Sequence, residues 1–149
     1  MSPSDLEAAP GTEQSNEIGR IVNAALDAWV DGDLERMLSH VAEDVIYTLY
    51  LAEADVPFAG ETRGKPAVRA ALQLMRQTFD YILFRRFPLI IEGVTARHQV
   101  EFMYRHITTG EMLTGRFRIV WTVENGLIQR SDEYHDAERI KAFMRLVYS

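Results

Sequence analysis

The strongest candidates for chemistry lie near the end of the chain. Four polar residues alternate there: Gln129, Ser131, Glu133 and His135. Successive side chains of a strand point to opposite faces, so these four should share one face and leave Asp132 on the other. Neighbours on one face lie about 7 Å apart, so Glu133 and His135 could contact one substrate or share one proton path. The simpler alternative is that the two residues satisfy each other, or water, at the strand end.

The protonation chemistry of Glu133 depends on its surroundings. In an apolar cavity a carboxyl group favours its neutral form, and such a group can act as an acid or a base near neutral pH. An arginine within reach would instead hold the carboxylate as a fixed anion. The pattern therefore allows either proton transfer or a purely electrostatic role.

Other reactive groups are poorly placed for catalysis or metal binding. The four histidines, His40, His98, His106 and His135, show no paired metal-ligand spacing. Glu133 and His135 together would supply only two ligands. The chain has no Cys, which excludes thiolate chemistry, disulfides and cysteine-based metal sites. We therefore predict no metal and no cofactor.

Composition indicates one soluble domain. The 149 residues suffice for a single core, and 47% hydrophobic with 26% charged residues is typical of a globular protein. Residues 1–17 hold four acidic residues and no Lys or Arg, whereas the remainder is almost neutral. A body near neutrality attracts neither nucleic acid nor an anionic membrane surface, and no apolar run could span a bilayer. The N-terminus lacks the pattern of a secretion signal, which favours the cytoplasm.

Hydrophobic periodicity predicts the elements that position these residues. Apolar residues at helical spacing predict helices over residues 18–30, 34–41 and 66–77, and from 136 onward. β-branched and aromatic runs predict strands at 45–51, 81–92, 97–108, 111–124 and 127–135. Asn125-Gly126 is a strong hairpin signal. Residues 52–64 are expected to form a loop. This order of elements indicates an α+β fold.

One domain is expected at 18–149, after a tail. Residues 1–17 are polar, acidic and aperiodic, so they should be disordered or loosely attached. No internal repeat and no linker interrupts the remainder.

Two stretches resemble the nuclear-transport-factor-2-like superfamily. They are residues 24–50, continued by 61–72, and residues 124–140. The resemblance is to the SnoaL-like polyketide cyclases, the limonene-epoxide hydrolases and the ketosteroid isomerases. It implies a cone-shaped, curved antiparallel or mixed sheet with three to four helices around a pocket for a small apolar or cyclic molecule. It also implies a homodimer, joined through the outer face of the sheet.

The same resemblance suggests site residues. The final-strand catalytic acid of the epoxide hydrolases corresponds to Glu133, and their arginine to Arg105. Their first-strand tyrosine corresponds to Tyr47. The hydrolase's water-holding Asn and the isomerases' general-base Asp both correspond to Leu49, and the hydrolase's second carboxylate corresponds to Ile107. Because these polar groups are missing, the chain does not match the hydrolase mechanism.

The predicted site combines both lines of reasoning. The expected catalytic residues are Glu133, His135 and Arg105, and the expected pocket-lining residues are Tyr47, Leu49, Trp29, Met103 and Ser131. Proton transfer, cyclisation or dehydration of a small cyclic substrate suits this set better than hydrolysis does. The alternative is a non-catalytic ligand-binding or dimeric association domain, which in the second case would fill its cone with its own side chains.

Overall fold

The structure, a computed structural model, describes residues 10–148 and has the predicted α+β fold. The helices within this range are α2 (Pro10–Val30), α3 (Leu34–Leu38), α4 (Lys65–Thr78) and α5 (Ala137–Tyr148). The strands are β1 (Val41–Leu49), β2 (Gly60–Arg63), β3 (Phe79–Arg86), β4 (Ile90–Glu92), β5 (Thr95–His106), β6 (Met112–Glu124) and β7 (Leu127–Tyr134).

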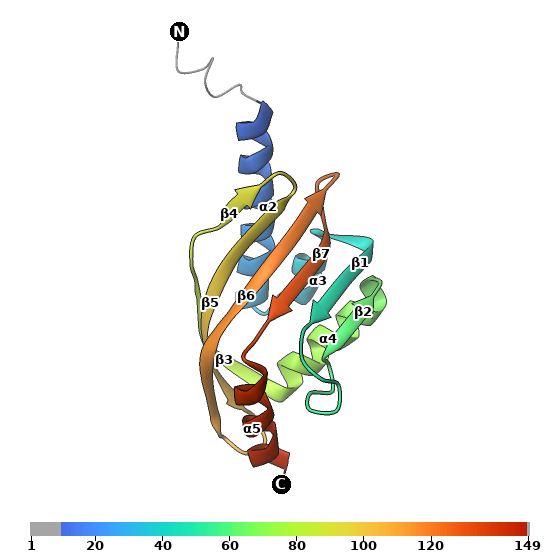
Figure 1. Cartoon of the computed structure of the whole chain (residues 1–149). Helices are drawn as coiled ribbons and strands as arrows, with labels where there is room; N and C mark the ends of the chain where they lie inside the picture. The colour runs from blue at the N-terminus through green and yellow to red at the C-terminus, as the bar shows by residue number, and fades with distance from the viewer. Residues whose placement is uncertain (1–9, 149) are drawn as a thin grey trace.

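The strands form one curved, mixed sheet. Its order is β2-β1-β7-β6-β5-β3, and β4 pairs with β5 beside β3. The β1–β7 pairing is parallel and every other pairing is antiparallel. Helices α2, α3 and α4 lie on one face of the sheet, and α5 lies across one end (Figure 1). The chain therefore encloses its core between a concave sheet and its helices.

Helix α2 is held by one apolar stripe. Its buried residues recur at helical spacing: Ile18, Ile21, Val22, Ala25, Leu26 and Trp29. The helix begins at Pro10 rather than at the predicted Ile18. The side chains of residues 12–17 are mostly exposed, so no hydrophobic periodicity marks this part of the helix in the sequence. Proline is favoured at the first helical position. The predicted tail thus ends inside this helix, and residues 1–9 lie outside the described residues.

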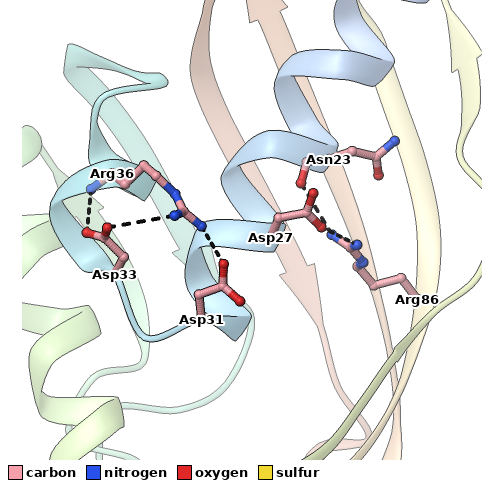
Figure 2. A network of polar contacts seen from close by, with 6 residues as sticks. All are labelled: Asn23, Asp27, Asp31, Asp33, Arg36 and Arg86. Carbon is pink, nitrogen blue, oxygen red and sulfur yellow. Dashed lines mark hydrogen bonds and ion pairs between the residues drawn. The ribbon is translucent and has the colours of Figure 1, made fainter.

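Surface ion pairs orient the first helices (Figure 2). Arg86 of β3 bridges to Asp27 of α2 at 2.6 Å. The Asp33 carboxylate caps α3 by accepting the backbone N–H of Arg36 at 3.1 Å, and the Arg36 guanidinium reaches Asp31 at 2.6 Å. Because these groups are largely exposed, each pair contributes little to the stability of the fold; the Asp27–Arg86 pair joins α2 to β3.

Several elements differ from the prediction. The helix predicted at 34–41 ends at Leu38, and the strand predicted at 45–51 begins four residues earlier, at Val41, and ends at Leu49. The predicted strand at 81–92 is divided into β3 and β4, and Pro88, which has no N–H for the ladder, lies between them. β2 occupies the end of the predicted loop and pairs with β1 as an edge strand. Its four residues, Gly60–Arg63, are mostly polar and half exposed, so no hydrophobic alternation marks them.

Bulges decide which side chains face inward. Ile82 is an extra residue in β3, because the pairing moves from Tyr81–Tyr104 to Leu83–Met103. Gln129 is an extra residue in β7, because Val123 pairs with Ile128 and Thr122 with Arg130. A third irregularity lies in β1 between Val41 and Ile46. The bulges in β3 and β7 exchange the inner and outer faces for the residues that follow them, whereas in β1 Val45, Tyr47 and Leu49 stay on the same side as Val41.

No helix within residues 10–148 is long and apolar enough to cross a membrane.

Candidate active site

The concave side of the sheet contains a cavity of about 110 Å³. Its wall is almost entirely apolar and comes from all four described helices and from β1, β3, β5, β6 and β7. An apolar cavity of about 150 Å³ is known to hold a benzene molecule, so this smaller one is near the lower limit for a single small ring. The cone is therefore hollow, contrary to the hypothesis of an association domain filled by its own side chains.

Glu133 is the acidic residue in this wall. It lies on β7 beside Leu49 of the parallel strand β1. Its Oε2 lies 2.7 Å from Nε2 of His135, and its Oε1 accepts a hydrogen bond from the Tyr47 hydroxyl at 3.2 Å. Its side chain is 17% exposed. No guanidinium or ammonium group within residues 10–148 contacts it, so its partners there are an imidazole and a phenol.

The surroundings of His135 indicate its tautomer. The imidazole stacks on Phe117, with ring centroids 4.8 Å apart, and meets the ring of Phe102 edge-on at 5.6 Å. Its Nδ1 is buried and has no hydrogen-bond partner among the described residues. A protonated imidazole would bury an unpaired N–H there, which is costly. This arrangement favours a neutral imidazole whose Nε2–H donates to an ionised Glu133.

Three tyrosines share the cavity with this pair. Burial, followed by the nearby Glu133 charge, raises the pKa values of Tyr47 and Tyr81. Burial and then the neighbouring Tyr81 raise the pKa of Tyr104 in the same direction. The three hydroxyls therefore stay protonated near neutral pH and can serve as hydrogen-bond donors.

Tyr81 and Tyr104 form a stacked pair across β3 and β5. They are directly paired in register, and their rings lie 4.1 Å apart at an angle of 16°. The rings therefore run nearly parallel from adjacent strands into the same cavity. Within residues 10–148 neither hydroxyl has a hydrogen-bond partner. They are thus free to donate to an oxygen atom of a bound molecule.

Most of the predicted site residues meet in this cone. Glu133, His135, Tyr47 and Leu49 line it together. Trp29 and Ser131 line it as well, Trp29 from α2 and Ser131 from β7. Asp132, the neighbour of Glu133, is not in the wall; its carboxylate pairs with Arg130 at 2.9 Å and accepts the Tyr50 hydroxyl at 2.8 Å.

Three of the predicted positions lie elsewhere. Arg105 forms an ion pair with Asp80 on the outer face, half exposed, because the alternation of β5 turns Tyr104 and His106 inward instead. The same alternation places Met103 in a separate outer hollow rather than in the cone. Gln129 is not in the cone wall, because the bulge at this residue removes it from the face of Ser131 and Glu133.

Tyr81 and Tyr104 were absent from the predicted site. The signal for Tyr104 was present in the sequence: alternate positions of β5 from Ala96 through Val100 and Phe102 are apolar, and Tyr104 continues the row. For Tyr81 no comparable signal exists, because the bulge at Ile82 breaks the alternation of β3.

No group of three or more His, Asp or Glu side chains within residues 10–148 is arranged to hold a metal ion. Acid–base groups and hydroxyl donors therefore carry the chemistry that the described residues of the cone can offer.

Solved structures share this fold. A nuclear transport factor 2-like protein of unknown function from Burkholderia pseudomallei has 20% identity and a TM-score of 0.76, over 89% of this chain and 98% of that one. A Rhodopseudomonas palustris protein, provisionally designated an isomerase, has 17% identity and a TM-score of 0.75, over 88% and 96% of the two chains. TerC, co-crystallised with polyporic acid, has 19% identity and a TM-score of 0.72, over 89% and 99%.

Sequence comparison gives the family. None of the curated proteins matches the chain. The SnoaL-like domain matches residues 22–131, which include α3, α4 and most of the strands around the cone. The chain therefore belongs to the SnoaL-like domain family, within the nuclear transport factor 2-like superfamily.

Proposed function

We propose that the protein is an acid–base enzyme of the isomerase or cyclase type that acts on a small, largely apolar cyclic ketone. One observation carries this proposal: Glu133 lies in an apolar cavity with room for a ring, and its partners there are His135 and Tyr47, at 2.7 and 3.2 Å. A carboxylate without a cationic partner remains available to take a proton.

Glu133 would act as the base. It takes a proton from a carbon next to the substrate carbonyl, and the electrons of that C–H bond move to the carbonyl oxygen to give an enolate. The protonated Glu133 then returns a proton to the same carbon, which exchanges its hydrogen, or, where the substrate carries a neighbouring C=C bond, to the far carbon of the dienolate, which moves that double bond. In a cyclisation the enolate carbon would instead attack a second carbonyl carbon of the substrate, and Glu133 would give its proton to the alkoxide oxygen formed there. His135 and Tyr47 would hold the carboxylate in place during both steps.

Tyr81 and Tyr104 would bind the carbonyl oxygen. Their hydroxyls are protonated, lack partners among the described residues and line the same cavity as Glu133. Donors aimed at the oxygen on which negative charge develops lower the barrier to enolate formation. The apolar wall strengthens this effect, because little water screens the charge.

The relatives support a small-molecule role. Solved structures similar to this chain include proteins provisionally designated as polyketide cyclases from Xanthomonas campestris and Pseudomonas putida, beside the provisional isomerase and the TerC complex with polyporic acid. A pocket that binds a ligand without transforming it is the second candidate, because His135 and Tyr47 already satisfy both oxygens of Glu133.

Cyclohexanone offers a direct test, because its six-membered ring suits a cavity of this size. Its binding can be followed by the fluorescence of Trp29 and Trp121, which both line the cone. Exchange of its α-hydrogens in D₂O, followed by ¹H NMR, reports proton transfer. We expect the protein to accelerate this exchange and Glu133→Gln to slow the catalysed rate by at least about a hundredfold.

Asp132→Asn is the matched control, because Asp132 is the adjacent acid but lies outside the cone wall. It should leave exchange within about threefold of the unmodified protein. Binding without any catalysed exchange would favour the ligand-binding module. Absence of both binding and exchange would refute the proposed function.

A further inference from the structure

A second hollow adjoins the cone at the acid–base pair. It has a volume of about 530 Å³ and lies between the start of α5 and strands β3, β5 and β6. Three of its lining residues, Phe102, His135 and Ile140, also line the cone. The two spaces thus share part of their lining, and one of the shared residues is the histidine that contacts Glu133.

Gly115 lines this hollow and makes room there for the ring of Phe102. On β6 the buried residues Leu113, Phe117, Ile119 and Trp121 form a regular inward row, and Gly115 is the gap in it. A Cβ at this position would come within 3.2 Å of two ring carbons of Phe102 and 3.8 Å of the Arg139 Nε. Its backbone φ is not in the left-handed region that calls for glycine. The absence of a side chain here therefore serves space rather than backbone conformation.

The floor of the hollow is apolar and uncovered. Leu83 is 39% exposed, and Met103 lies beside it in the register of β3 and β5. The charged groups at the rim already have partners: Arg116 pairs with Glu101 at 3.1 Å, the Arg139 guanidinium donates to Thr114 at 3.1 Å, and the Asp136 carboxylate accepts the Arg139 backbone N–H at 3.3 Å. This chemistry suits an uncharged, apolar group.

We propose that the hollow beside Gly115 is a subsite for an apolar arm of the same substrate whose reacting ring occupies the cone. The inference rests on the proposed function. A cavity of about 110 Å³ holds one small ring and no more, whereas the adjoining hollow is several times larger. The substrate class is therefore a ring ketone that carries a phenyl-sized or short alkyl substituent.

Cyclohexanone and 4-phenylcyclohexanone test this, because they share the reacting ring and differ only in the arm. We expect the phenyl compound to bind at least about tenfold more tightly, since burying an aryl group removes apolar surface from water. Leu83→Trp should fill the hollow from its exposed side and reduce this advantage to about twofold or less. It should leave the affinity and α-hydrogen exchange of cyclohexanone within about twofold.

Ile82→Trp is the matched control, because Ile82 is the adjacent residue, is 55% exposed and does not line the hollow. The Ile82→Trp variant should bind 4-phenylcyclohexanone more tightly than cyclohexanone by the same factor as the unmodified protein does. Met103→Trp offers a second block, because Met103 lines the hollow and not the cone. The subsite is refuted if the phenyl compound binds no more tightly than cyclohexanone, or if its advantage survives both blocking variants. Failure of both ketones to bind would instead overturn the proposed function and the subsite with it.

Discussion

Arg76 offers a sharp test of the electrostatics around the cone. Its guanidinium lies over the rings of Trp29 and Tyr81, 4.2 and 4.5 Å from their centroids. Its Nη2 is buried without a hydrogen-bond partner among the described residues. A buried unpaired donor costs about 1–3 kcal/mol, whereas each cation–π contact contributes about 0.5–2 kcal/mol. The two effects therefore nearly cancel.

We expect Arg76→Met to leave the free energy of unfolding within about 1 kcal/mol of the unmodified protein. Methionine keeps an apolar stem against the two rings and removes the unpaired donor. Arg76→Lys keeps the charge but loses the flat guanidinium, so it should cost about 1–2 kcal/mol. Urea unfolding at neutral pH, followed by tryptophan fluorescence, measures both. A costly Arg76→Met beside a neutral Arg76→Lys would show that the charge, rather than the stacking, is what the fold needs.

Three further predictions concern pH and assembly. Burial lowers the pKa of His98, whose Nε2 accepts the Trp121 N–H at 3.2 Å, so the folded state favours the neutral ring. The unfolded state then binds more protons as pH falls below about 6.5, so the free energy of unfolding should drop there. Between pH 7.5 and 5.5, measured by urea unfolding, the free energy of unfolding of His98→Gln should fall by about 1 kcal/mol less than that of the unmodified protein. An equal fall in both proteins would contradict this. The cone tyrosines Tyr47, Tyr81 and Tyr104 have raised pKa values, so absorbance at 295 nm at pH 10.5 should show less phenolate in the native protein than in the protein unfolded by urea. The free energy of unfolding should fall as pH rises above about 10, because the unfolded state then loses protons more readily. Equal phenolate signals would show the hydroxyls to be exposed. Exposed Tyr50, Tyr134 and Met112 on the outer sheet face favour a homodimer, so light scattering should give twice the chain mass of 17.1 kDa, and the monomer mass at micromolar concentration would exclude it.

The sequence predicted those elements whose side chains alternate without interruption. β6 is the clearest case, because Phe117, Ile119 and Trp121 recur at every second position and all three line the cone, whereas Arg116, Arg118, Val120 and Thr122 between them do not. Asn125-Gly126 forms the predicted hairpin turn, with φ angles of 55° and 74°. Local signals of this kind are sufficient because the type of each residue in the row indicates whether its side chain is buried.

Positions that follow a bulge were harder to predict. Nothing in the residue types around Ile82 or Gln129 shows that one residue is extra, because the irregularity depends on how the neighbouring strands pair. Arg105 was assigned through resemblance, although the apolar row that ends at Tyr104 already placed it on the outer face. The Tyr81–Tyr104 pair could not be predicted, because it combines residues from two strands and their register depends on the bulge at Ile82.

The contrast between two adjacent acids explains why chemistry should be confined to one of them. Asp132 pairs with the Arg130 guanidinium at 2.9 Å and accepts the Tyr50 hydroxyl at 2.8 Å, so its carboxylate is engaged outside the cone. Glu133 faces an imidazole and a phenol, which orient a carboxylate without neutralising its charge. The bulge at Gln129 precedes both residues, so it determines which acid faces the cone. Deletion of Gln129 removes only the extra residue and leaves the pairing of Ile128 and Arg130 with Val123 and Thr122 as a regular ladder, so Glu133 should still face the cone and α-hydrogen exchange should persist within about tenfold. Loss of exchange in this variant would show that the strand has shifted its register and turned Asp132 inward.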